Sequence, residues 1–257
     1  VGVLSGRVAN VTFENPDVTA SKHAGIICAY AGSNGTNPAI VENVNIINGK
    51  VTQNSGNHSG LIFGHSNVNG CEFTNITVSG TIAQNAIGDS GFIGGAQNKA
   101  ATFTNCHATG TLTLKSGLSA DATATNICTG GIQGFDAGSA YDGCSFSGTI
   151  NGGRLCGGIV GYNQVAGVNI SDCHVSNATI KSVAIGSAPG EKVGGVVGLV
   201  TGGNVSECSF EGNITASGRE VGGIAGQFIG GKGQIEKCDS YANISTSSGY
   251  VGGIVGR

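Results

Sequence analysis

The chain has 257 residues, of which 48 are glycine and only 11% are charged, a composition that excludes a helix bundle and a disordered chain and favours short strands and turns. The net charge of -3, with lysines and arginines spread singly, excludes a phosphate-tracking surface, so we expect no nucleic-acid partner. The longest apolar runs span about five residues, so we expect no membrane insertion of this segment.

In chain order, the first recurring motif places an apolar residue, a second one three residues later, and a third two residues after that. Val8, Val11 and Phe13 form the first copy, and the next copy begins at Val41. In later copies a cysteine takes the middle position, which we call the cysteine column. The later copies centre on Cys71, Cys106, Cys144, Cys173, Cys208 and Cys238, so eight copies cover the chain with a mean period of about 32 residues.

The spacing within this motif predicts a local structure. Alternation after the cysteine indicates a strand with the cysteine and the residue two positions later inside, and with polar residues such as His107 and His174 outside. The uneven step of three residues before the cysteine predicts a bend or a bulge at that point.

A second motif, the glycine box, lies between successive copies of the first. It reads GGIVGY at residues 157–162, recurs at 194–199, 222–227 and 252–257, and departs from this form at GIICAY (25–30) and GLIFGH (60–65). No helix-forming run and no Lys-Ser/Thr pair follows it, which argues against a phosphate loop. We expect its glycines to supply a positive φ at a corner or a close approach between backbones.

These repeats predict the fold. A unit of about 30 residues cannot bury its own apolar face, whereas stacked units close a continuous core. We therefore expect an all-β chain that forms a parallel β-helix-like solenoid of about eight coils. Residues 1–257 should form a single repeat array, which we expect to be a segment of a longer solenoid.

Two long inserts, residues 114–126 and 182–192, interrupt the repeats. Both leave the coil at the same phase, so they should project from one side, roughly 10 Å apart. Loops on a rigid scaffold commonly carry recognition, and this small polar composition suits a shallow contact with a protein or a glycan. A connection without a ligand is the alternative. The candidate ligand-contact residues are Lys115, Asp121, Asn126, Glu191 and Lys192.

Three of the nine cysteines lie outside the cysteine column. Cys128 and Cys156 occupy nearly equivalent corners, which leaves a disulfide bridge between them open beside the alternative of two free thiols, and Cys28 has no evident partner. Within the column we expect packed thiols, because Val11 and Val44 fill the same position.

Catalytic and metal-binding groups are sparse. The five histidines share no metal-ligand spacing, and we interpret Asp172, Glu207 and Glu236 as surface charges on neighbouring coils. We therefore expect no catalytic residue, no metal site and no cofactor.

The two motifs together resemble the GLUG repeat, whose units read Gly-Leu-hydrophobic-Gly followed by Asn-Cys-Tyr-Ala-Thr-Gly. The similarity is carried by boxes such as GGIVG and by TNCHATGTL at residues 104–112, and it is best from Gly157 to Gly256. The resemblance implies large secreted or surface-anchored bacterial proteins, including adhesin-like proteins and the non-catalytic regions of immunoglobulin-cleaving metallopeptidases. It implies no reaction, and the chain has no His-Glu-x-x-His motif.

The expected function is that of a non-enzymatic, extracellular or cell-surface segment with a structural or adhesive role. Its partners would be a host-cell protein or glycan, or neighbouring repeat segments that stack end to end. A carbohydrate-binding or carbohydrate-cleaving β-helix is the first alternative. An ice-binding solenoid is the second, suggested by TGTLT at residues 109–113, although no Thr-x-Thr pattern holds through all units.

Overall fold

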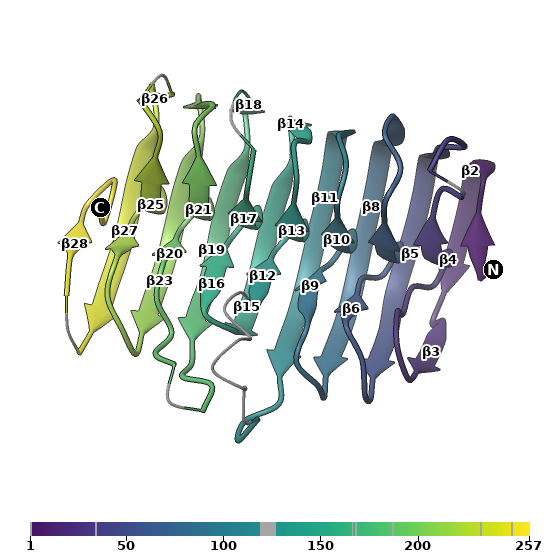
Figure 1. Cartoon of the computed structure of the whole chain (residues 1–257), viewed down its shortest axis with the longest axis horizontal. Helices are drawn as coiled ribbons and strands as arrows, with labels where there is room; N and C mark the ends of the chain where they lie inside the picture. Colours follow the sequence, from purple (N-terminus) through teal and green to yellow (C-terminus); the bar gives the residue numbers. More distant parts are fainter. Residues whose placement is uncertain are drawn as a thin grey trace.

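The computed structural model describes residues 2–33, 35–118, 127–165, 167, 169–186, 188–231, 233–247 and 249–257. Within these ranges the regular elements are 28 β-strands, and no helix is present. All pairings between named strands are parallel, and the coils follow one another from the N-terminal end of the molecule to the C-terminal end (Figure 1). The expected β-solenoid of about eight coils is confirmed.

Each coil visits three sheets in a fixed order, which we call A, B and C. Sheet A contains β1 (Val3–Leu4), β4 (Cys28–Ala31), β7 (Phe63–Ser66), β10 (Gly94–Gln97), β13 (Gln133–Asp136), β17 (Val160–Asn163), β21 (Val197–Thr201) and β25 (Ala225–Ile229). Sheet C contains β6 (His58–Ser59), β9 (Asp89–Gly91), β12 (Cys128–Gly130), β16 (Leu155–Gly157), β20 (Val193–Gly194), β24 (Val221–Gly222) and β28 (Val251–Gly252).

Sheet B is the widest face of the solenoid, because each coil contributes one long strand or two shorter ones. Its strands are β2 (Gly6–Glu14), β3 (Asp17–Ala20), β5 (Ala39–Gln53), β8 (Cys71–Gln84), β11 (Ala101–Leu114), β14 (Ala140–Asp142), β15 (Ser145–Gly152), β18 (Asn169–Ser171), β19 (His174–Ser182), β22 (Asn204–Ser206), β23 (Ser209–Ala216), β26 (Gln234–Glu236) and β27 (Asp239–Thr246). The long strands lie side by side along the molecule, with the shorter strands of sheets A and C in front of them in Figure 1.

The core is built from side chains that repeat at equivalent positions of successive coils. One cluster of buried apolar residues runs from Ala24 to Ala225. Within it the rings of Phe73, Phe103 and Tyr141 stack along the axis with centroids 4.9 and 4.8 Å apart. Stacked aromatic pairs stabilise a core by more than the hydrophobic burial of their rings alone provides.

The structure corrects the predicted cysteine column at one coil. Cys106 pairs with Ile76 rather than with Cys71, which lies five residues earlier, opposite Ala101. The reason is that two overlapping frames satisfy the same apolar spacing in this stretch, and only pairing with the next strand chooses between them. The column is therefore Val11, Val44, Ile76, Cys106, Cys144, Cys173, Cys208 and Cys238.

The predicted bend before the cysteine column is present in every coil. The residue directly before the column has a left-handed backbone, with φ between 50° and 62°. The residues at this position are Asn10, Asn43, Asn75, Asn105, Gly143, Asp172, Glu207 and Lys237. Asparagine and glycine tolerate this conformation best, and the first four side chains also form an amide ladder with N–O distances of 3.0, 3.1 and 3.2 Å.

The glycine box is required by close backbone contacts. A Cβ atom on Gly158 would lie 2.3 Å from the carbonyl oxygen of Gly195 in the next coil. One on Gly161 would lie 2.6 Å from the backbone nitrogen of Thr129. The described glycines of the four boxes from residue 157 onward have no positive φ, so close approach is the correct explanation and the corner conformation is not.

The second position of each box shares one core slot with the residue two after the cysteine column. Where the box has Gly131 or Gly195, a Cβ atom there would lie 2.5 or 2.2 Å from the ring of Phe146 or Phe210. In the preceding coil the box carries Phe92 instead, and the column partner of Phe146 is Ala108. In these three coils a large residue at one position accompanies a small one at the other, which keeps the packed volume filled.

Candidate functional site

The first insert begins beside a shallow polar hollow on sheet B. Its volume is about 420 Å³, and its lining combines the polar residues Asn85, Thr113, Lys115, Ser116, Asn151 and Lys181 with the apolar residues Ala83, Leu114 and Val183. Thr113, Asn151 and Lys181 occupy one position in three successive coils, so the strand register brings them together. The Lys115 backbone N–H donates to the carbonyl oxygen of Gln84 at 2.8 Å, which fixes where the insert leaves the sheet.

The chemistry of this hollow suits an anionic or hydroxyl-bearing ligand. Two ammonium groups and several amide and hydroxyl groups line it, and none of its described lining residues is acidic. Lysine binds carboxylate or sulfate as a point charge, and the amides and hydroxyls can donate and accept hydrogen bonds. Of the predicted contact residues, Lys115 is therefore placed where it can meet a ligand.

The two inserts lie on the same side of the solenoid, as predicted, but they are closer than the expected 10 Å. The Gly186 N–H of the second insert donates to the Leu118 carbonyl oxygen of the first at 3.1 Å. Ile185 also packs with Leu114 and Ile127 in a small buried cluster. Asp121 and Asn126, two of the predicted contact residues, lie outside the described residues.

Glu191 and Lys192 pair with other charged residues of the chain. Glu191 is only 9% exposed and accepts hydrogen bonds from Arg154 at 2.5 Å and from Lys192 at 3.1 Å. Lys192 also lies 3.9 Å from Glu220, which pairs with Arg257 at 2.9 Å. Together, Arg154, Glu191, Lys192, Glu220 and Arg257 form an ion-pair network that links four successive coils.

This network sets the charge of the Glu191 carboxylate. Burial alone would raise the pKa of Glu191, but the hydrogen bonds and charges of Lys192 and Arg154 outweigh it and lower the pKa below its ordinary value. The carboxylate is therefore ionised and already satisfied. This pairing gives Glu191 and Lys192 a structural role, and their contact with a ligand stays a prediction.

The bridge considered between Cys128 and Cys156 is not formed. Both are free, buried thiols, and the register pairs Cys156 with Thr129 rather than with Cys128. Neighbouring residues of a strand point to opposite faces, so this offset of one residue directs the two sulfur atoms away from each other. Cys28 is likewise free and buried, and burial raises the pKa of Cys28 and of Cys156 to about 12. Such thiols are unreactive at neutral pH.

Two of the acidic residues on the outer face have individual partners. Asp172 lies 3.0 Å from the His174 ring, and Glu207 accepts from the Lys237 ammonium at 3.0 Å. All four side chains are more than half exposed. This agrees with the interpretation of these residues as surface charges.

The structure also brings together residues that the sequence analysis did not connect. His23, His58 and His65 meet where sheets A and C adjoin, with ring centroids 5.1, 5.1 and 5.2 Å apart. Tyr30 stands edge-on to His23 at 4.6 Å and to His65 at 5.3 Å. We call these four residues the histidine cluster.

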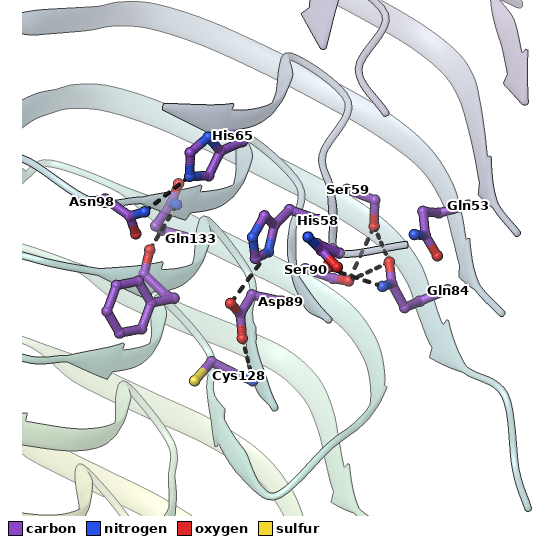
Figure 2. Close-up of polar contacts among 12 residues, drawn as sticks. Gln53, His58, Ser59, His65, Gln84, Asp89, Ser90, Asn98, Cys128 and Gln133 are labelled. Carbon is purple, nitrogen blue, oxygen red and sulfur yellow. Dashed lines mark hydrogen bonds and ion pairs between the residues drawn. The ribbon is translucent and has the colours of Figure 1, made fainter. Parts of the chain in front are cut away.

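Polar partners lie against two of these rings, His58 and His65 (Figure 2). The His58 ring lies 3.3 Å from the Asp89 carboxylate, whose other oxygen accepts the Cys128 backbone N–H at 2.9 Å. The His65 ring contacts the Asn98 side-chain amide at 2.9 Å. The sequence did contain a signal for part of this arrangement, because His23 and His58 each stand two residues before the first glycine of a box.

The described residues contain neither a metal-binding group of side chains nor a membrane-spanning helix. No group of three or more His, Cys, Asp or Glu side chains in the described ranges is arranged to hold a metal ion. Over the same ranges, no helix of sufficient length and apolarity to cross a membrane is found.

Comparison with known proteins identifies the repeat. The model of the GLUG motif matches residues 190–215, which include the box at 194–199 and Cys208. Halomucin from Haloquadratum walsbyi is 31% identical over 177 residues, a match that covers 65% of this chain and 2% of halomucin. The chain thus spans a small part of that relative's length, and no solved structure matches it. The chain is a structural repeat protein that carries the GLUG motif.

Proposed function

We propose that this chain is a non-enzymatic segment of a secreted or cell-surface protein that displays an adhesive surface on a rigid solenoid. The GLUG motif at residues 190–215 supports this proposal, since the repeat it represents resembles those of secreted and surface-anchored bacterial proteins. Halomucin, of which the match covers only 2%, is a long protein that contains similar sequence.

The observation that carries the adhesive part is the polar hollow beside the first insert. The strand backbones and inward side chains of the solenoid are committed to stacking, whereas the side chains of Lys115 and Lys181 are exposed and line one hollow from different coils. Two lysines with neighbouring amides and hydroxyls favour an acidic glycan as the partner.

Binding of the chain to immobilised acidic and neutral polysaccharides tests this proposal. The variant Lys115→Ser/Lys181→Ser should lose most of its binding to the acidic polymer and keep its thermal midpoint. The matched control Lys99→Ser/Lys237→Ser removes the same charge from exposed lysines outside the hollow and should bind normally. Equal losses in both variants would show only a general charge effect and would contradict the assignment of the hollow.

A second candidate function is ice binding, which one column of sheet B favours. Thr81, Thr111, Thr149 and Thr179 face one another in four successive coils, beside Ser79, Thr109 and Ser147 in three of them. Hydroxyl groups repeated at the strand spacing of about 4.8 Å form a regular array. Thermal hysteresis measured on the wild type and on Thr111→Lys would test this; no hysteresis in the wild type rejects it.

A further inference from the structure

We propose that the histidine cluster is an acid-sensitive latch, which holds the first three coils together while its imidazole rings are neutral. This inference is independent of the proposed adhesive function. It concerns His23, His58 and His65, which neither the GLUG motif nor the hollow involves.

The cluster joins three successive coils. His23 precedes Ala24, which forms a bridge with Ser59 at the sheet C position of the first coil. His58 belongs to β6 in the second coil, and Asp89, its partner, belongs to β9 in the third. His65 lies in β7 and pairs with Tyr30 of β4. Any force that separates the rings therefore acts between coils.

The charges around the rings can balance one proton only. The titratable and charged groups that face the cluster are Asp89 and Lys22, in addition to the three imidazoles and the Tyr30 phenol. The Asp89 carboxylate, 3.3 Å from the His58 ring, can offset one positive charge in the cluster. A second or third proton places like charges on rings about 5 Å apart, with Lys22 adding to the repulsion.

Burial adds to this repulsion. The Nδ1 atoms of His23 and His65 are buried and have no hydrogen-bond partner among the described residues, so a proton there would be neither solvated nor shared. Burial first, and then the neighbouring His58 charge, lower the pKa of both rings from 6.5 to about 4.

The direction of the pH effect follows from these pKa values. Because the pKa of each ring is lower in the folded state than in the unfolded chain, the stabilisation is complete above pH 6.5. It is lost as the pH falls from 6.5 through about 4. At pH 5 a pKa shift of this size would raise the equilibrium constant for opening by about 30-fold per ring. Solvent screening of these half-buried rings reduces that factor.

Hydrogen exchange measured amide by amide tests the latch. The amides of Ala24 and Ile26 donate across coils to His58 and Leu61, and they report opening of the first coils. Between pH 7.5 and pH 5 we expect their protection factors to fall at least about tenfold. The amides of Val196 and Val221, in distant coils, should change by less than about threefold over the same range.

Matched variants separate the latch from a general effect of acid. His23→Gln/His65→Gln should remove the extra pH dependence at Ala24 and Ile26. His107→Gln/His174→Gln removes two exposed histidines, which bond to Ser145 and Ser209, and should leave it unchanged. Uniform loss of protection in all coils, or an unchanged pH dependence in the first variant, would overturn the proposal.

A second measurement on the wild type decides the case if the double variant does not fold. Ring carbon shifts followed by NMR should show that His23 and His65 titrate below pH 5. Titration of His23 and His65 near 6.5 would contradict the latch, because the rings would then gain no stability from remaining neutral.

Discussion

Replacing Gly161 by alanine tests the explanation of the glycine box. The added Cβ atom would lie 2.6 Å from the Thr129 backbone nitrogen, 2.7 Å from the Gly134 carbonyl oxygen and 2.9 Å from the Thr129 carbonyl oxygen. All three are backbone atoms of the preceding coil, so no flexible side chain can move to make room. Overpacking of a core typically costs 1–3 kcal/mol, and we expect a value at the upper end, about 3 kcal/mol.

Urea unfolding of wild type and Gly161→Ala, followed by far-UV circular dichroism, measures this loss. For a chain of this size, about 3 kcal/mol corresponds to a fall in the thermal midpoint of roughly 6–12 °C. The control is Gly231→Ala, where a Cβ atom would meet nothing within 4 Å, and it should remain within about 0.5 kcal/mol of wild type.

The comparison of Gly161→Ala with Gly231→Ala tests the close-approach explanation. A loss of less than about 1 kcal/mol in Gly161→Ala would refute the close-approach argument, since the backbones could then separate cheaply. Equal losses in both variants would point instead to a general sensitivity to added methyl groups.

Four further changes test other parts of the structure. Cys208→Val should lower the free energy of unfolding by less than about 1.5 kcal/mol, because Ile76 and Val44 occupy the same column. Cys208→Asp should lower it by several kcal/mol, because the carboxylate would be buried without a partner. Equal urea midpoints for the two variants would show that the thiol itself is required. Glu207→Gly should stabilise by about 0.5 to 1 kcal/mol, because φ is 56° there and the exposed ion pair with Lys237 contributes little, and Glu207→Ala is the control that should not. Burial raises the pKa of Asp136 from 3.8 to about 6, so its contribution to stability is complete below pH 3.8 and is lost as the pH rises through 6. Relative to Asp136→Asn, wild type should therefore lose about 2 to 3 kcal/mol of unfolding free energy between pH 3.5 and pH 8. Parallel pH profiles of the two proteins would contradict this. Phe92→Gly should cost about 3–5 kcal/mol, and adding Ala108→Phe should restore part of that stability by refilling the core slot; a double variant no more stable than Phe92→Gly would refute the shared slot.

The repeat and the fold could be predicted because they depend on spacing along the chain. The positions of Val8, Val11 and Phe13, and of their later equivalents, are dictated by a strand with a bend, and the bend appears in every coil. The frame at Cys71 could not be chosen in this way. Val68, Cys71 and Phe73 have the same spacing as Phe73, Ile76 and Val78, so only the pairing of Phe73 with Phe103 resolves the register.

The site was less predictable because its side chains meet across coils. Glu191 looks like a loop carboxylate in the sequence, yet Arg154, 37 residues earlier, covers it. His23, His58 and His65 have no metal-ligand spacing along the chain, and their rings meet only because the first coils stack on one another. The length of each coil decides which side chains become neighbours, and that length varies from one coil to the next.

The fold accepts a wider range of sequences than the wording of the motif suggests. Residues 25–30 lack two of the glycines of the box, but Cys28 still pairs with Phe63 and Tyr30 with His65. The second position of the box can change because Phe92 fills core volume that Phe146 or Phe210 supplies in other coils. The cysteine column needs apolar volume, and the residue before it needs a left-handed backbone, which even Lys237 adopts. What must recur is therefore the backbone path and the total volume of each core layer. Within one layer, the large side chain can come from the glycine box or from the strand after the cysteine column without disturbing the next layer.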